Sequence, residues 1–597
     1  MKEKIKALYV PKSYGTYSDT CLMLGLACLA EYVLGATGQK QGMQLIDRGT
    51  YYRIQFNKPM DLSKIESVSY FDLFPIVVGA KTKTEKLPEE VHQFSTVENS
   101  QARSLYKNWR IETKGKEKWR EDAPNPPDSR TQNGTILTSM RHDRNHNGLW
   151  EEAWNIKNYF GNLVGTILEV FSDRDIAFQS AVDTIATSFK QKTGEKLPTQ
   201  ASAVKIYMPS SIQGVNRVLA DGIGSSSQKD AWLNLWLIAK GLFDFALSER
   251  IKVADNTFDW RVVVLEHKDI SLNNYRSVLS DLKQLNPPGS GYGIARFDAE
   301  LVLRFSQEML NLSCQTGRKS KLVSNFHGSH FGSKGQVYGL KDVFSLGLPE
   351  WMKIDSNEIG RAIAFHKILD EHLKIVRSLD EKQTEILVAY RDFITSSQLK
   401  VFFPFQLLYA DYCSKKLAKE EYVRLFSRSG LNIMVRSISN SNSKQENNNK
   451  NIEDVIYDEG FERIAKAINY ATVRAGQILV KKGKDSKPYP KKDFEFKRFY
   501  GLAQRLGSRT ASKEDFLSEL AIFITEYKSE YLRLKSKLSK EETMLLSDVN
   551  VTDLDRVAKL ILNWGNNSSL IPNLLIAYGH CYWDRKSAKS TDDNQDS

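Results

Sequence analysis

Apolar residues recur along the chain with two periods, about 2 and about 3.6 residues, which are typical of strands and of helices. Runs of strand length occur mostly in the first half, at residues 7–10, 51–56, 69–78, 204–208 and 262–266. Apolar residues at i, i+3 and i+4 predict helices at residues 150–171 and 232–245 and through most of 357–426. A further helix is predicted to begin with Ser18 or Asp19 as N-cap and to end near Gly35. We therefore expect an α+β protein whose mixed α/β N-terminal region precedes a mainly helical region.

The last part of the chain has its own helical pattern after a polar tract. Residues 437–450 are almost wholly Ser, Asn, Lys and Gln. Such a segment has too little apolar surface to bury, so burial cannot offset the loss of chain entropy on folding. Helices are predicted at 461–471, 496–503, 516–524 and 553–562, the last with a capping box of Thr552 and Asp555. The predicted organisation is therefore an N-terminal part at 1–435, a linker at 436–451 and a C-terminal helical bundle at 452–597.

Charge and cysteine content limit the classes of function. The net charge of +12 favours an anionic partner. The five cysteines are scattered, odd in number and without a CxxC pair, which indicates a reducing compartment and excludes a zinc ribbon. No apolar run is expected to reach membrane-spanning length, so we expect a cytoplasmic protein without a membrane partner.

Motifs of catalysis and metal binding are incomplete. Residues 143–148 match the first half of a calcium loop, but Trp154 stands where the bidentate Glu is needed, so a solvated Asn/Gly turn is the simpler interpretation. His142 and Asp143 form an HD pair without further ligands, and His327 and His330 are expected on a surface loop rich in Gly and Ser. There is no GxxxxGK[ST] or GxSxG sequence. We therefore expect no catalytic residue, no metal, no cofactor and no enzymatic activity.

Two segments combine cations with amide, hydroxyl and glycine residues, a mixture suited to nucleic-acid contacts. Both are expected to be loops, at residues 128–144 and 210–229. Residues 85–133, which overlap the first loop, are predicted to form an exposed insertion. The ordinary alternative is a pair of helix-connecting loops. The candidate contacts are Arg130, Asn133, Arg141 and Arg144 in the first segment and Lys205, Gln213, Asn216, Arg217 and Lys229 in or beside the second.

A third cationic cluster lies within the C-terminal bundle. Its charges gather in one segment instead of alternating in sign, which favours binding to a nucleic-acid backbone over a merely solvated surface. The candidate contacts are Lys481, Lys482, Lys491, Lys492, Lys497, Arg498, Arg505 and Arg509.

An ordered set of short motifs resembles a known family. The motifs are Asp19-Thr-Cys-Leu-Met-Leu-Gly-Leu-Ala, Gln213-Gly-Val-Asn-Arg-Val-Leu-Ala-Asp-Gly, Phe461-Glu-Arg-Ile-Ala-Lys-Ala-Ile-Asn-Tyr-Ala-Thr-Val and Phe499-Tyr-Gly-Leu-Ala-Gln. Together with Asp515-Phe-Leu-Ser-Glu-Leu, they are similar to the large subunit of type I CRISPR effector complexes (Cascade), in the I-B and Myxan-like branch. The likeness is patchy but spans the chain in the right order.

The resemblance implies a non-catalytic subunit of an RNA-guided surveillance complex. Its N-terminal part would lie at the 5′ handle of the guide RNA and inspect the protospacer-adjacent motif of double-stranded target DNA. The C-terminal bundle resembles the small subunits that support the guide–target duplex and the displaced strand. Implied partners are the other subunits and either a nuclease-helicase or transposition proteins. The alternatives from other classes are a standalone metal-dependent nuclease and a purely structural scaffold.

In some relatives the small subunit is translated from an internal start within the large-subunit gene. Met434 stands just before the polar linker, so its position would permit such a product here. The alternative is that Met434 is an ordinary internal methionine.

Overall fold

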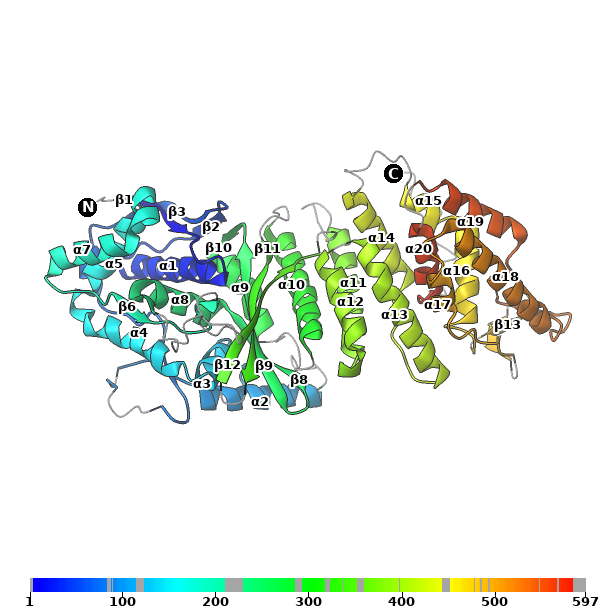
Figure 1. Ribbon diagram of the computed structural model, residues 1–597, viewed down its shortest axis with the longest axis horizontal. Coiled ribbons are helices and arrows are strands. Elements are labelled where there is room, and N and C mark those ends of the chain that lie inside the picture. Colours follow the sequence, from blue (N-terminus) through cyan, green and yellow to red (C-terminus); the bar gives the residue numbers. More distant parts are fainter. Residues whose placement is uncertain are drawn as a thin grey trace, which may run out of the picture. The chain divides into compact units, whose positions relative to one another are not determined.

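The computed structural model divides the chain into two compact units (Figure 1). Unit 1 comprises Met1–Leu348 and Ile354–Asn357, and unit 2 comprises Pro349–Lys353 and Glu358–Ser597. The predicted linker at 436–451 falls inside unit 2, so the division between compact units lies about 90 residues earlier than expected. The residues described are 4–82, 87–88, 90–113, 123–209, 229–284, 293–316, 323–334, 337–349, 351, 359–396, 398–442, 451–476, 478–483, 486–491, 494–546, 548–565 and 569–583. They contain both helices and small sheets, which confirms the α+β class.

Unit 1 begins with an antiparallel sheet of order β1-β3-β2-β10. Its strands are β1 (Lys4–Pro11), β2 (Met43–Asp47), β3 (Tyr51–Asp61) and β10 (Asp269–Ser271). Leu45 and Ile54 are fully buried, whereas their neighbours along each strand are partly exposed, and on β1 the buried Leu8 and Val10 flank the partly exposed Tyr9. This alternation gives the sheet one core face and one outward face.

Two long apolar helices form the centre of unit 1 (Figure 1). They are α1 (Tyr17–Ala36) and α8 (Trp232–Phe245), and they approach at glycines. A Cβ on Gly25 would lie 1.9 Å from the Leu237 carbonyl oxygen, and one on Gly241 would lie 2.0 Å from the Cys21 carbonyl oxygen. The absence of a side chain at these two positions therefore permits backbone contact between the helices.

The N-cap residue of α1 is not the one that was predicted. Thr16 is the N-cap, whereas the Asp19 carboxylate accepts hydrogen bonds from the backbone N–H groups of Ser13, Tyr14 and Gly15 at 2.8, 2.9 and 2.8 Å. The helix is also long and apolar enough to cross a membrane, contrary to the expectation that no run would be. Most of it is buried inside unit 1, as in a core helix of a soluble protein.

A second antiparallel sheet of unit 1 has the order β12-β11-β9-β8. It consists of β8 (Leu247–Ala254), β9 (Thr257–His267), β11 (Val323–Lys334) and β12 (Val337–Gly347), beside α9 (Leu272–Gln284) and α10 (Ile294–Thr316). The buried Arg261 on β9 forms two hydrogen bonds of 2.8 and 2.7 Å to Asp298 on α10. This bidentate pair joins the sheet to α10.

The remaining elements of unit 1 are further helices and two short strand pairs. They are the 3-10 helices Ile65–Ser67 and Lys157–Tyr159, the parallel pair β4 (Ile76–Val78) and β5 (Gln93–Ser95), α2 (Thr96–Thr113), α3 (Thr131–Ser139), α4 (Asp143–Asn155), α5 (Phe160–Phe171), α6 (Arg174–Gln179), α7 (Ala181–Thr193), and the pair β6 (Gln200–Ser202) and β7 (Lys229–Ala231). Much of the predicted insertion at 85–133 is therefore ordered, as β5 and α2. The strand predicted at 69–78 is reduced to β4, and residues 204–207 form turns.

Unit 2 is mainly helical. Its elements are α11 (Ile359–Ser378), a 3-10 helix at Glu381–Gln383, α12 (Thr384–Ser396), α13 (Leu399–Ala418), α14 (Arg428–Asn442), α15 (Ile452–Ile456), α16 (Glu459–Ala471), β13 (Leu479–Lys482), β14 (Tyr489–Pro490), α17 (Leu502–Gly507), α18 (Lys513–Lys535), β15 (Glu542–Met544), α19 (Val551–Asn563) and α20 (Leu570–Gly579). The short strands form a sheet of order β14-β13-β15.

Helices from both sides of the predicted linker share one core in unit 2. Helix α13 packs against α17 and α20, and α14 packs against α15. Met434 is fully buried in the middle of α14, so a product that began there would start inside a helix and lack α11 to α13. The capping box of α19 consists of Asn550 and Asp553 instead of Thr552 and Asp555.

Candidate nucleic-acid interface

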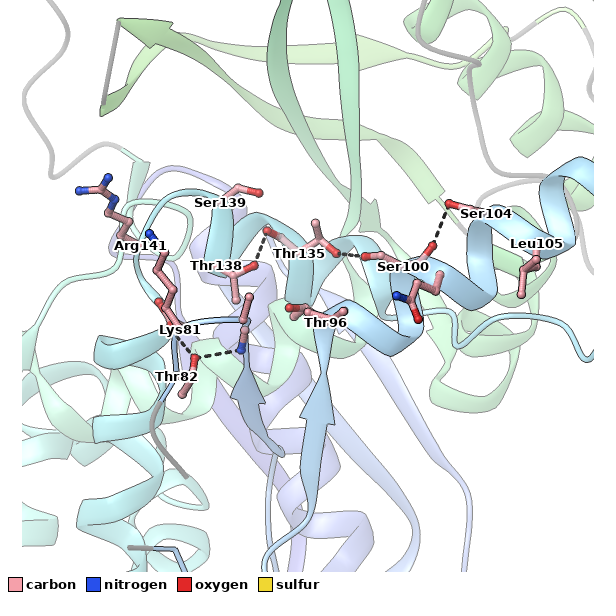
Figure 2. Close-up of a pocket in the computed structure, with 15 residues that line it drawn as sticks. Lys81, Thr82, Thr96, Ser100, Ser104, Leu105, Thr135, Thr138, Ser139 and Arg141 are labelled. Carbon is pink, nitrogen blue, oxygen red and sulfur yellow. Dashed lines mark hydrogen bonds between the residues drawn. The ribbon is translucent and has the colours of Figure 1, made fainter. Parts of the chain in front are cut away.

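A groove rich in hydroxyl groups lies on unit 1 between α2, α3 and the segment that follows β4 (Figure 2). Its volume is about 1280 Å³. The exposed side chains of Val97 and Leu105 contribute apolar surface to it. We call it the hydroxyl groove, and its lining is Gly79, Ala80, Lys81, Thr82, Thr96, Val97, Ser100, Gln101, Ser104, Leu105, Thr135, Thr138, Ser139, Arg141 and Asp143.

Helical spacing places the hydroxyl groups on facing sides of α2 and α3. Thr96, Ser100 and Ser104 recur every four residues and therefore share one side of α2. Thr135 and Thr138 lie on α3, and the Thr135 and Ser100 hydroxyl oxygens are 3.2 Å apart. This hydrogen bond joins the two helices beside the hydroxyl groove (Figure 2).

Two cations, Lys81 and Arg141, lie at the same end of the hydroxyl groove (Figure 2). Neither forms an ion pair with the residues that the structure describes. Arg141 has a φ of 58°, an unusual value for a residue other than Gly, in the turn between α3 and α4. The nearby Asp143 carboxylate accepts a 3.0 Å hydrogen bond from Thr82, whose hydroxyl in turn accepts one of 2.9 Å from the Gly79 N–H. The cationic end is thus built on an ordered turn.

The predicted calcium and HD motifs lie in or next to helix α4 and have structural contacts. The Asn147 side chain exchanges two hydrogen bonds with the backbone of Val77, at 2.9 and 3.0 Å. His146 is buried and bonds to the Tyr207 hydroxyl and, at 3.0 Å, to the Pro75 carbonyl oxygen. Burial lowers the pKa of His146 to about 4, so the ring is neutral at pH 7. The described residues include no group of three or more His, Cys, Asp or Glu placed to hold a metal ion.

His327 and His330 lie on strand β11, not on the expected surface loop. His330 is buried, and its Nε2 lies 2.8 Å from an Asp259 carboxylate oxygen that also accepts a 2.8 Å bond from Lys341. His327 is 3.2 Å from Glu266. The Gly and Ser residues that suggested a loop are accommodated in a long antiparallel hairpin.

Two of the predicted contact residues have structural roles that occupy their polar groups. Asn133 is buried, and its side-chain nitrogen donates to the carbonyl oxygens of Phe243 and Ala246 at 2.9 and 2.8 Å, at the end of α8. Arg130 forms a bidentate pair with Asp128 and lies over the Phe94 ring at 5.5 Å. Burial opposes the charge of Asp128, but the hydrogen bonds from Arg130 outweigh it and hold the pKa of Asp128 below its usual value.

The other predicted contacts of unit 1 are dispersed. Arg144 is exposed on α4 and Lys229 is exposed on β7. Lys205 donates a 2.8 Å hydrogen bond to the Tyr338 carbonyl oxygen, and partial burial lowers the pKa of its amine. Arg141 is the predicted residue that lines the hydroxyl groove. Gln213, Asn216 and Arg217 lie outside the described residues.

Several of the C-terminal cations are paired with acids. Lys491 lies 2.7 Å from Glu542, and Arg505 lies 2.7 Å from Glu519 and 3.1 Å from Glu526. Lys482, Lys497 and Arg509 are exposed, and Lys481 and Arg498 are half-buried. Lys492 lies outside the described residues. The basic face is therefore narrower than predicted, because α18 and β15 supply carboxylates to it.

Most residues of the hydroxyl groove were not predicted from the sequence. Lys81, Ser100, Ser104, Thr135 and Thr138 were not singled out. The signal that could have found them is the recurrence of Thr or Ser at 96, 100 and 104 and at 131, 135 and 138, which places hydroxyl groups along one face of each helix.

No protein-family model matches the chain, and no curated protein matches it either.

Proposed function

We propose that the chain is the non-catalytic large subunit of an RNA-guided CRISPR effector complex and that the hydroxyl groove contacts the target DNA. The observation that carries the proposal is the pair of cations Arg141 and Lys81, without an ion-pair partner among the described residues, beside a row of Ser and Thr hydroxyl groups. Cations and hydroxyl groups are the side chains that bind phosphate oxygens in protein–DNA contacts. Ser104, Thr135 and Thr138 donate to backbone carbonyl oxygens of their own helices, so the two cations are the principal phosphate donors of the hydroxyl groove. The ordered family resemblance supplies the biological setting.

In this proposal protein and guide divide the work of recognition. Base pairing with the guide RNA reads the long target sequence, while the protein checks a short flanking motif and the shape of the backbone. The protein would act in the cytoplasm with the other subunits of the complex, and with a nuclease-helicase or transposition proteins. The exposed Lys482, Lys497 and Arg509 of unit 2 are the candidates for contacts with the displaced strand.

Duplex binding by the full-length chain tests the hydroxyl groove. We expect Lys81→Ala and Arg141→Ala to weaken binding and to reduce the salt dependence, by about 0.9 in the slope of log K against log salt for each phosphate that the variant no longer neutralises. Lys58→Ala is the matched control, because Lys58 is exposed on β3 and does not line the hydroxyl groove. Unchanged affinity and slope in both groove variants would remove the hydroxyl groove from the proposal.

The sequence dependence of the weakened binding separates two roles for Arg141. If Arg141 reads a base, its substitution costs about 1–3 kcal/mol on the preferred flanking motif and relaxes discrimination at one position. An equal weakening on every flanking sequence instead assigns Arg141 to a phosphate. We expect no degradation of the duplex when Mg²⁺ or Mn²⁺ is supplied, and degradation that disappears with purified Asp143→Asn would favour the nuclease alternative.

A further inference from the structure

A cavity in unit 2 lies where helices from both sides of the polar tract at 437–450 meet. Helix α13, which precedes the tract, packs against α17 and α20, which follow it (Figure 1). Residues of these three helices line a cavity of about 600 Å³, a volume typical of small-molecule sites. We call it the unit 2 cavity. It shares no residue with the hydroxyl groove, so a ligand here is independent of the DNA contacts proposed above.

One wall of the unit 2 cavity is apolar. Leu399, Phe403 and Leu407 recur every four residues along one side of α13, and all three line the cavity. Leu570 of α20 extends this wall. Leu407 and Leu570 are only partly buried, although Leu407 packs closely on Gly507 of α17. An aliphatic ligand would therefore cover apolar surface that unit 2 leaves in contact with solvent.

Two helices begin at the unit 2 cavity. Leu399 and Lys400 are the first residues of α13, and Ser569 and Leu570 are the N-cap and the first residue of α20. Neither helix is capped by the side chain of its N-cap residue, and neither has an acidic residue in its first turn. The N–H groups at the start of a helix carry a partial positive charge that attracts anions. The apolar wall is thus bordered by a positive end.

The charged side chains around the cavity also favour an anion. Lys400 is exposed and has no ion-pair partner among the described residues, and the described lining contains no Asp or Glu. Glu514 and Asp515 belong to the first turn of α18, are exposed and do not line the cavity. The short α17 ends at Gly507, whose carbonyl oxygen already accepts a 3.0 Å hydrogen bond from the Thr510 hydroxyl. Positive charge at this end is therefore left for a ligand to compensate.

We propose that the unit 2 cavity binds an aliphatic monocarboxylate of medium chain length. The carboxylate lies at Lys400 and at the starts of α13 and α20, and the chain lies along Phe403 and Leu407. A single negative charge is the better match, because the described lining supplies one cation. The ligand contacts helices from both sides of the polar tract, so it holds α13 against the C-terminal helices. Binding is therefore expected to raise the melting temperature of unit 2.

Calorimetric titration of the full-length chain with decanoate, kept below its micellar concentration, tests the ligand class. We expect the affinity to rise about fourfold for each methylene group between octanoate and decanoate, because each is buried against the apolar wall. Decanol has the chain without the charge, and acetate has the charge without the chain. Each is expected to bind at least about tenfold more weakly than decanoate.

Two substitutions of one residue test the location. Ser569→Asp places a negative charge where the carboxylate binds and is expected to weaken decanoate binding at least about tenfold. Ser569→Asn is its matched control and is expected to bind within about threefold of wild type, since Asn and Asp are both favourable N-cap residues. Lys400→Met keeps the apolar stem and is expected to bind about 2-fold to 5-fold more weakly. Lys419→Met changes an exposed lysine at the other end of α13, outside the cavity, and is expected to have no effect.

Each outcome decides the proposal. Binding of decanoate that is lost in Ser569→Asp but kept in Ser569→Asn and Lys419→Met supports it. No binding of decanoate by wild type, or equal binding of decanol and decanoate, overturns it. Equal binding of decanoate by Ser569→Asp and Ser569→Asn overturns the location. Thermal melting checks the fold, and Lys400→Met decides the result if Ser569→Asp melts early. Duplex binding by the same variants is expected to be unchanged, so either proposal can fail without the other.

Discussion

A single side-chain amide holds the C-terminal end of α8. Asn133 donates to Phe243 and Ala246 from a buried position, so Asn133→Ala leaves two carbonyl oxygens without that partner. We expect the free energy of unfolding to fall by about 1–3 kcal/mol. Urea unfolding measures the change. Arg144→Ala, at an exposed position, is expected to change it by less than about 0.5 kcal/mol. A stable Asn133→Ala variant that lost only DNA discrimination would restore Asn133 as a base reader.

The buried His267 predicts a stability that depends on pH. Its ring stacks on Tyr52, and neither ring nitrogen has a partner among the described residues. Burial lowers the pKa of His267 to about 3, below the unfolded value of about 6.5. The unfolded chain therefore takes up the proton first, and the contribution of the neutral ring is complete above about pH 6.5 and declines as the pH falls towards 3.

Replacing the ring by a hydrocarbon removes this titration. We expect His267→Phe to lose about 1.6 kcal/mol less stability than wild type between pH 6.5 and pH 5, because the unfolded ring is half protonated at pH 6.5 and full uptake of one proton is worth about 1.36 kcal/mol per pH unit. Urea unfolding at the two pH values measures the difference. Parallel losses in both proteins would contradict the role assigned to His267.

At the scale of elements, the crossing of α1 and α8 predicts opposite effects for two similar substitutions. Gly241→Ala would place a Cβ 2.0 Å from the Cys21 carbonyl oxygen, which forces the two backbones apart. We expect a loss of about 3 kcal/mol or more. In Gly35→Ala the added Cβ has nothing within 4 Å, so the better helix former is expected to add up to about 1 kcal/mol. Thermal melting compares the two variants, and equal melting temperatures would mean that the helices do not touch at Gly241.

Elements fixed by local periodicity were predictable, and elements fixed by distant contacts were not. Helix α8 has both predicted ends, 232 and 245. In contrast, the apolar run at 204–208 forms turns, where the Ser18 hydroxyl donates to the Tyr207 carbonyl oxygen at 2.6 Å. The helix expected from residue 496 begins only at Leu502, because the N–H groups of Phe496 and Phe499 bond to Ala475 and Ala471 instead.

The residues of the candidate site likewise divide into those that local sequence predicts and those that tertiary contacts bring together. Arg141 could be predicted from the sequence, because a cation within a polar segment is recognisable without knowledge of its tertiary contacts. The hydroxyl groove depends on two helices, α2 and α3, whose hydrogen bond between Ser100 and Thr135 is a tertiary feature. The pairing of Arg505 with Glu519 and Glu526 is likewise set by the packing of α18.

At the scale of the whole molecule, the division into units predicts which fragments fold. Trp351 is buried against Phe365, with ring centroids 5.9 Å apart, so unit 2 needs the residues from 349 onwards. We expect residues 349–597 to unfold cooperatively on heating and residues 434–597 to lack a cooperative transition. The shorter fragment lacks α13, whose Leu407 packs closely against Gly507 of α17. Circular dichroism measures the thermal unfolding of both fragments. Cooperative unfolding of the shorter fragment would support a separate product that begins at Met434.

The packing of α1 against α8 also has a consequence for synthesis of the protein. Helix α1 leaves the ribosome roughly 200 residues before α8, a delay of about 10 to 40 s at ordinary elongation rates. During that time the nascent chain carries an apolar helix whose partner has not been made, a surface that chaperones bind. We expect ribosome-stalled chains that end before residue 232 to be digested readily by protease. Chains long enough to expose residue 347, where β12 completes the second sheet of unit 1, are expected to resist, since the core of unit 1 can then close on the ribosome.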